Sequence, residues 1–241
     1  MAVTTLDHWR AGLTAVPDSV WAHPGAEVLQ LADNALTELP ARIATMTRLR
    51  MLDLGHNRLT RIPDELCALT GLSGFLYLHD NQMSVLPAEL GRLTRLAYLN
   101  VGENRLTALP ASLGEMAGLV ELRAQHNLLT ALPDSVGGLG ALRELWLRGN
   151  QLTALPDSVR QLHELREAEL RDNRFASLPE PLRGLPLLRR IDLRSNRLRE
   201  VPGWVAELPS LEKLDLRWND LAGSCGPVLD ALARRGCVVL R

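Results

Sequence analysis

One asparagine recurs along this chain at a nearly constant interval. Successive copies lie 23 residues apart, except that Asn57 and Asn81 lie 24 apart. Each copy sits within the pattern LxxLxLxxNxLxxLPxxLxxLxx. A unit this short cannot bury its own leucines, so consecutive units must stack and share one continuous core. The nine repeated asparagines are Asn34, Asn57, Asn81, Asn104, Asn127, Asn150, Asn173, Asn196 and Asn219.

The two halves of the pattern predict two kinds of local structure. The Leu-x-Leu before each asparagine alternates inward and outward, which is typical of a short half-buried strand. The later LxxLPxxLxxL has apolar residues three to four positions apart, with proline at the expected first position of a short helical turn. Stacked units therefore predict an α/β solenoid, with a parallel sheet on one side and short 3₁₀ or α segments on the other.

This pattern resembles that of the leucine-rich repeat family over about residues 26–220. The proline-containing form is similar to the repeats of bacterial cytosolic and effector proteins and of plant intracellular Ras-group-related proteins. The resemblance implies a horseshoe-shaped solenoid whose asparagines form a structural ladder between neighbouring backbones. It also implies a concave sheet that binds a protein or peptide noncovalently, as an interaction module or scaffold.

The two ends of the chain predict caps on a single continuous domain. Residues 1–22 are expected to form an N-terminal cap made of a helix and a half-repeat, because Leu6, Trp9 and Leu13 lie at near-helical spacing. Residues 23–220 hold the nine repeats. Residues 221–241 are expected to form a C-terminal cap, with a helix from Pro227 to Arg235 and an edge strand from Cys237 to Leu240.

Composition limits the partners and the compartment. The 241 residues carry a net charge of -1, so no overall basic field favours nucleic acid, and no apolar run is long enough to span a membrane. The start, MAVTTLDHWR, does not resemble a signal peptide, and three cysteines are too few for a disulfide framework, which favours a cytoplasmic protein. A Cys225–Cys237 bridge, self-association of an expected monomer, and a role as the targeting part of an injected bacterial effector stay open.

Alternation within each strand predicts three outward rows of side chains. The first row precedes the first inward residue and holds Val28, Met51, Phe75, Tyr98, Glu121, Glu144, Glu167, Arg190 and Lys213. The second row follows that residue and holds Gln30, Asp53, Tyr77, Asn100, Arg123, Trp146, Glu169, Asp192 and Asp215. The third row follows the second inward residue and holds Ala32, Gly55, His79, Gly102, Gln125, Arg148, Arg171, Arg194 and Arg217.

Aromatic residues gather on the early repeats. Because Phe and Tyr cover large areas with few rotatable bonds, they are typical anchors of protein interfaces. Gly55 and Gly102 would leave a shallow well beside them. The alternative is that these rings only cover the sheet, for which aromatic residues have high propensity. The predicted partner-binding residues of this half, with the nearby tryptophan, are Met51, Phe75, Tyr77, His79, Tyr98 and Trp146.

A ladder of arginines marks the later repeats. Arg148, Arg171, Arg194 and Arg217 could orient an acidic part of a partner. The alternative is that Glu169, Asp192 and Asp215, in the adjacent row, neutralise them across strands. Nucleic acid is the least favoured partner, because over the last five strands the three rows together hold seven basic and six acidic residues, a net charge of only +1.

A metal-dependent or enzymatic role is the competing interpretation. A column of ionisable residues precedes the asparagines, and carboxylates with imidazoles can hold a divalent ion. No enzyme activity and no cofactor are expected, because no nucleotide-binding or hydrolase motif is present: the only lysine is Lys213, and Gly137–Gly140 lies in a return segment. Cys67 is expected to be packing filler. The column comprises Asp33, His56, Asp80, Glu103 and His126, with His79 alongside.

The single 24-residue interval arises from an extra residue at Ser73-Gly74. One extra residue within a strand would turn every side chain to the other face, so a bulge or widened loop is expected before the strand. We expect either that this bulge re-aims Phe75 or that the insertion is neutral.

Overall fold

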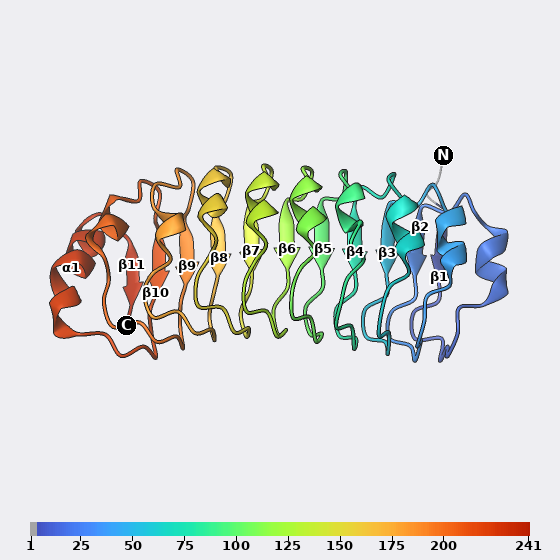
Figure 1. Ribbon diagram of the computed structural model, residues 1–241, viewed down its shortest axis with the longest axis horizontal. Helices are drawn as coiled ribbons and strands as arrows, with labels where there is room; N and C mark the ends of the chain where they lie inside the picture. Colours follow the sequence, from blue (N-terminus) through green and yellow to red (C-terminus); the bar gives the residue numbers. More distant parts are fainter. Residues whose placement is uncertain (1–3) are drawn as a thin grey trace.

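The computed structural model describes residues 4–241, except for the side chain of Ser224. These residues form a solenoid with one sheet of 11 parallel strands, which stand side by side in chain order (Figure 1). Every strand has three residues, and neighbouring strands pair centre to centre, as Leu99 does with Leu76 and Leu122. The strands are β1 (Thr5–Asp7), β2 (Val28–Gln30), β3 (Met51–Asp53), β4 (Phe75–Tyr77), β5 (Tyr98–Asn100), β6 (Glu121–Arg123), β7 (Glu144–Trp146), β8 (Glu167–Glu169), β9 (Arg190–Asp192), β10 (Lys213–Asp215) and β11 (Val238–Leu240).

Short 3₁₀ turns return the chain from one strand to the next. The sequence predicts proline as the first helical residue, and this is wrong by one position, because proline is the N-cap in most turns. Pro110, for example, has φ -65° and ψ 146°, and its carbonyl accepts the first turn bond from the Leu113 amide at 3.0 Å. The ring therefore fixes an extended residue at the entry of the turn. The turns are η1 (Asp18–Ala22), η2 (Ala41–Thr45), η3 (Asp64–Ala68), η4 (Leu90–Arg92), η5 (Ala111–Glu115), η6 (Asp134–Gly138), η7 (Asp157–Gln161), η8 (Glu180–Leu182), η9 (Gly203–Glu207) and η10 (Gly223–Cys225).

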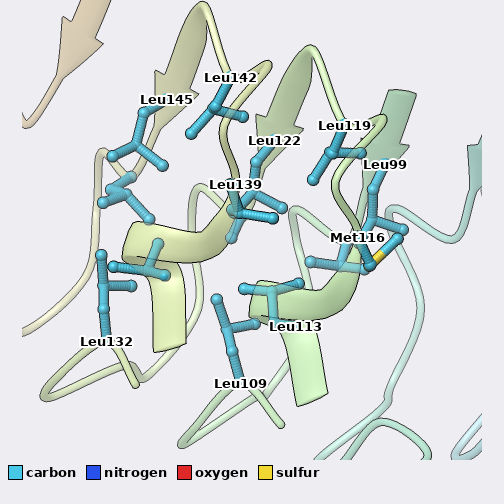
Figure 2. Packing of buried hydrophobic residues seen from close by; sticks show 14 of the residues in the cluster. Leu99, Leu109, Leu113, Met116, Leu119, Leu122, Leu132, Leu139, Leu142 and Leu145 are labelled. Atoms are coloured by element: carbon cyan, nitrogen blue, oxygen red, sulfur yellow. The ribbon is translucent and has the colours of Figure 1, made fainter. Parts of the chain in front are cut away.

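The core lies between the sheet and the turns (Figure 2). Leu122 at the centre of β6 and Leu113 and Leu139 from the turns are all fully buried. Each such leucine stabilises the fold by about 1.5–3 kcal/mol relative to an exposed one. Because every unit contributes the same positions, the core continues along the whole stack without a break.

The repeated asparagines connect each unit to the one before it. The Nδ2 group of Asn104 donates to the carbonyl of Leu78 at 3.0 Å and to that of Val101 at 3.1 Å. Its Oδ1 accepts from the amide of Met83 at 3.0 Å. Equivalent bonds recur at the other repeated asparagines, for example at Asn57 and Asn173. The side chains thus pair backbone groups that strands of only three residues leave unmatched.

The N-terminal segment differs from the helix expected there. Thr5–Asp7 is the strand β1, and Leu6 pairs with Leu29 in β2. The apolar residues Leu6 and Leu13 lie one repeat length before Leu29 and Leu36, so they continue the repeat although no asparagine marks it. A spacing of three to four residues fits both a helix and this pattern, which explains the wrong helix. Residues 1–3 of the expected cap lie outside the described residues.

At the other end, a helix and a strand cover the last repeat. Helix α1 runs Gly226–Arg234 and buries Leu229 and Leu232 against the core, and β11 pairs with β10. The sequence predicts this helix and strand within one residue at each boundary. Arg235 adds a link, because its Nη2 donates to the carbonyl of Leu208 at 2.9 Å.

Candidate protein-binding surface

The sheet has one outward face, which we call the concave face. Central strand residues such as Leu76 and Leu122 are fully buried, whereas their neighbours are at least partly exposed in most strands. The three rows predicted from the sequence therefore lie together on this face. Strand pairing brings each row into register, as Met51 with Phe75 and Phe75 with Tyr98.

Three rings on β4 and β5 form an aromatic cluster, defined here as Phe75, Tyr77 and Tyr98. Ring centroids lie 5.9 Å apart for Phe75 and Tyr77, 5.5 Å for Phe75 and Tyr98, and 5.0 Å for the two tyrosines. Phe75 is 44% exposed. Burial raises the pKa of Tyr98 to about 12, so its hydroxyl stays protonated at neutral pH. The cluster offers a rigid apolar surface with hydroxyl groups at its edge.

Arg123 connects the aromatic cluster to Trp146. Its guanidinium lies 5.8 Å from the centroid of the Tyr98 ring and 4.7 Å from that of Trp146, and its Nε donates to Glu121. Trp146 Nε1 in turn donates to Glu144 Oε2 at 3.1 Å. Sequence reasoning did not select Arg123, Glu121 or Glu144 as site residues. The sequence does indicate this contact. In strand order, Tyr98 of the first row is followed by Arg123 and Trp146 of the second row, so Arg123 lies between two aromatic residues.

The glycines beside the cluster do not leave the wells expected from the sequence. A Cβ on Gly55 would lie 2.4 Å from the His79 ring, and a Cβ on Gly102 would lie 2.5 Å from the Gln125 amide. Third-row side chains of the next strand therefore fill both positions. Burial, with His56 as the second cause, lowers the pKa of His79. Its ring lies edge-on to His56, 4.8 Å between centroids.

The extra residue before β4 leaves the register intact. Leu76 still pairs with Leu52, and the Gly74 amide donates to the Arg50 carbonyl at 2.9 Å, as the residue before the strand does in other repeats. Ser73 is therefore the additional residue, placed between Leu72 and the regular position. A Cβ at Gly74 would lie 2.9 Å from the Arg50 carbonyl oxygen, so glycine permits this close approach.

The charge of the arginine ladder is partly neutralised, mainly by aspartates two residues earlier in the same repeat. Arg194 donates to Asp192 at 2.9 Å, and Arg217 donates to Asp215 at 2.8 Å. Burial would raise the pKa of Asp215, but hydrogen bonds from Arg217 hold it below the usual value. Within residues 4–241, the expected cross-strand pairing of the ladder is limited to a weaker contact of Arg194 with Asp215 at 3.5 Å.

The other two arginines of the ladder differ. Arg171 lies 3.1 Å from Asp172, on the turn that follows its strand. Arg148 makes no ion pair within residues 4–241. The free positive charge of the ladder is therefore concentrated at Arg148.

The column before the asparagines is shaped by the backbone. These positions adopt a left-handed conformation, with φ between 49° and 65°, a region in which Asp, Asn and His are enriched. Within the column, His56 Nδ1 lies 2.5 Å from Asp80 Oδ2, and His126 Nε2 lies 3.6 Å from Glu103 Oε1. The described residues contain no group of three His, Cys, Asp or Glu side chains placed to hold a metal ion. The left-handed residues are Asp33, His56, Asp80, Glu103, His126, Asp172, Ser195 and Trp218, with Gly149 in the same position.

The cysteines and the glycine-rich segment belong to the packing. Cys67, Cys225 and Cys237 are buried free thiols, and burial raises the pKa of Cys67 to about 11, which makes it a poor nucleophile. The Gly137–Gly140 segment lies in η6 and just after it, where a Cβ on Gly137 would lie 2.5 Å from the Ser158 carbonyl oxygen. The close contact between turns η6 and η7 therefore explains why position 137 is glycine.

Two sequence profiles match almost the entire repeat region. The profile described as leucine-rich repeat region matches residues 74–170, and the profile described as leucine rich repeat matches residues 24–83 and 169–221. None of the curated proteins compared matches the chain. Within the described residues, no helix has both the length and the hydropathy that a membrane crossing requires.

Solved structures with the same architecture come from plants and bacteria. The ectodomain of the Arabidopsis thaliana membrane receptor kinase GASSHO1/SCHENGEN3, in complex with CASPARIAN STRIP INTEGRITY FACTOR 2, is 28% identical with a TM-score of 0.79, over 90% of this chain and 27% of that one. The functional domain of InlJ from Listeria monocytogenes is 26% identical with a TM-score of 0.79, over 95% of this chain and 47% of that one. A repeat protein of Leptospira interrogans, 20% identical with a TM-score of 0.54, shares the fold over 97% of this chain and 94% of that one. The chain thus spans less than half the length of the solved plant ectodomain and of the solved InlJ domain.

Proposed function

Since this chain belongs to the leucine-rich repeat family, we propose that it is a protein-interaction module that binds a protein or peptide noncovalently on its concave face. The plant receptor with the same architecture was solved with a bound factor, which supports a protein or peptide as the partner class. A preformed sheet loses little entropy on binding, because its backbone is already fixed by the ladder of neighbouring repeats.

The aromatic cluster is the observation that carries this proposal. Phe75, Tyr77 and Tyr98 contact one another on adjacent strands, and Arg123 extends the contact to Trp146. Exposed aromatic groups held in fixed geometry are typical centres of binding energy in protein interfaces. Met51 and His79 border the cluster on β3 and just beyond β4.

The arginine ladder would orient an acidic part of the partner. Arg148 is the best placed for this role, because it has no ionic partner among the described residues, whereas Arg194 and Arg217 are held by aspartates. Arg171 is intermediate. Charges at the edge of an interface mainly affect association rate and orientation, so we expect the ladder to contribute less affinity than the aromatic cluster.

The proposed module acts without catalysis, as a monomer in the cytoplasm. Three free buried thiols fit a reducing compartment, and the buried Cys67 is not an activated nucleophile. A metal-dependent function has less support, because the left-handed backbone accounts for the residue types of the histidine and carboxylate column.

The test is to capture partners from the source cell and to measure the affinity of each purified partner for variants. Phe75→Ala and Tyr98→Ala should each weaken binding by about 1.5–3 kcal/mol, more than tenfold, because each removes an aromatic anchor. Leu128→Ala is the matched control, since Leu128 is also 44% exposed but lies beyond the strand, after Asn127. Equal affinities of all three variants and the wild type would rule out the aromatic cluster as the binding site.

A further inference from the structure

The first row of the concave face changes its chemistry twice along the solenoid. It is apolar on β3 to β5, acidic on β6 to β8 and basic on β9 and β10, and each member pairs in register with the next. The members are Met51, Phe75, Tyr98, then Glu121, Glu144, Glu167, then Arg190 and Lys213. One straight line across the strands therefore carries three blocks in a fixed order.

The middle of the acidic block lacks a cationic partner. Glu121 accepts a hydrogen bond from Arg123, and Glu167 lies 3.6 Å from Arg190. Glu144 accepts only from the neutral indole N–H of Trp146 and makes no ion pair within residues 4–241.

The nearby arginines do not supply that partner. Arg143 and Arg166, which precede Glu144 and Glu167, face Glu164 instead, with N–O distances of 3.9 Å in both cases. The acidic block therefore stays short of positive charge although basic residues lie beside it.

The three in-register glutamates, Glu121, Glu144 and Glu167, destabilise the protein when nothing covers them. Carboxylates directly opposite on neighbouring strands repel one another. Burial raises the pKa of Glu167; Arg190 and Lys213 act in the opposite direction, whereas Glu144 and Glu121 raise it further. A cation placed over Glu144 would relieve this repulsion, so the acidic block favours positive groups on whatever covers it.

The length of the row defines the length of a matching segment. Strands in a sheet lie about 4.8 Å apart, so the seven intervals from β3 to β10 span roughly 34 Å. An extended chain advances about 3.3 Å per residue, so roughly ten residues cover this distance. Each block then corresponds to about three residues of a partner.

We propose that the partner contributes an extended segment that crosses the strands along the first row, in the order apolar, basic, acidic. Its apolar side chains contact Phe75 and Tyr98, its basic side chains cover Glu144, and its acidic side chains meet Arg190 and Lys213. The proposal rests on the proposed function, because it assigns the chemistry of the partner at the same face. Charge complementarity makes the order of the blocks, and not the composition alone, the basis of recognition.

Two synthetic peptides of identical composition test this order. The matched peptide has three apolar residues including tryptophan, then three arginines, then three glutamates. The exchanged peptide has the same apolar block followed by glutamates and then arginines, so it places like charges together. Because the apolar anchor is shared, we expect the matched peptide to bind about tenfold tighter at low salt. The difference should shrink at 0.5 M salt, where the Debye length is only about 4 Å.

Variants identify the residues responsible. Glu144→Gln should reduce the preference for the matched peptide several-fold, and it should also raise the urea midpoint of the free protein, because it removes one of three crowded charges. Glu115→Gln is the control, since Glu115 is exposed on η5, away from the concave face, and changes the net charge by the same amount. Tyr98→Ala should weaken both peptides equally.

The outcomes separate this inference from the proposed function. Equal binding of the two peptides, lost in Tyr98→Ala, would overturn the order of blocks and leave the aromatic site intact. Absence of binding by either peptide would also overturn the order, whereas the proposed function would still be decided by the partners captured from cells. An unchanged preference in Glu144→Gln would exclude the acidic block as its cause.

Discussion

At the scale of single residues, His79 has a confined position on the concave face. Its ring fills the space above Gly55, and its Nδ1 has no hydrogen-bond partner among the described residues. The charged and titratable groups around it are His56, Asp53, Asp80, Asp33 and Tyr77. A proton on the His79 ring would therefore be poorly solvated.

We predict that His79 makes the fold less stable in mild acid. Burial first, and His56 second, lower the pKa of His79 in the folded state below its ordinary value of 6.5. The unfolded chain then binds more protons below about pH 7, so the free energy of unfolding falls as the pH is lowered through that range. Urea unfolding at pH 7.5 and at pH 5.5 measures this loss.

The matched variant for this prediction is His79→Gln. Glutamine occupies the equivalent position above Gly102, where Gln125 lies, so the substitution should keep the packing while removing the titration. The variant should lose less stability than the wild type between the two pH values. The same loss in both proteins would show that other groups cause it.

The identities of several residues could be anticipated from the sequence, but their roles could not. The histidine and carboxylate column looked like a potential metal site, because spacing reveals neighbours and does not reveal φ. A left-handed position selects Asp and His for reasons of backbone geometry. Similarly, Gly55 looked like an open well, because the direction of the His79 side chain depends on packing between strands.

At the scale of elements, the 3₁₀ turns of the central repeats interlock through glycine and serine. A Cβ on Gly91 would lie 2.0 Å from the carbonyl oxygen of Ser112, and a Cβ on Gly114 would lie 2.0 Å from that of Ser135. The Ser112 hydroxyl also accepts from the Gly91 amide at 3.0 Å. These turns are therefore in direct backbone contact.

We predict that Gly114→Ala destabilises the protein by about 1–3 kcal/mol, because the new methyl group forces two turns apart. Gly140→Ala is the control, since a Cβ there meets nothing within 4 Å. Chemical denaturation followed by circular dichroism measures both. A Gly114→Ala protein as stable as the control would show that the turns can separate at no cost.

Elements inside the repeats were easier to predict than those at the ends of the solenoid. The strands and return turns could be predicted from apolar spacing, because the same pattern occurs in every unit and each copy supports the assignment made from the others. The N-terminal strand was missed because Leu6 and Leu13 fit a helix equally well when the asparagine is absent. The exact position of proline was missed by one residue, because both the N-cap and the first helical position tolerate its missing N–H.

At the scale of the whole molecule, stability depends on contacts between neighbouring repeats. Helix α1 and strand β11 cover the last repeat, and Leu232 is almost fully buried there. In a solenoid, a local change is felt mainly by adjacent units. The C-terminal cap therefore protects the last strands more than the centre.

We predict that Leu232→Ala costs about 2–5 kcal/mol locally and opens the C-terminal end. Hydrogen exchange should accelerate in β10 and β11 while β5 and β6 keep their protection. Leu113→Ala, at an equally buried position of η5, should instead affect the centre. Uniform acceleration along the chain in both variants would indicate one cooperative unit.

The asparagine ladder has a direction. The Asn104 amide reaches back to the carbonyl of Leu78, and its oxygen holds the amide of Met83, both in the preceding repeat. During synthesis, each new asparagine can therefore complete the repeat that has already left the ribosome, without waiting for anything downstream. The protein is built so that its order of translation can also be its order of assembly.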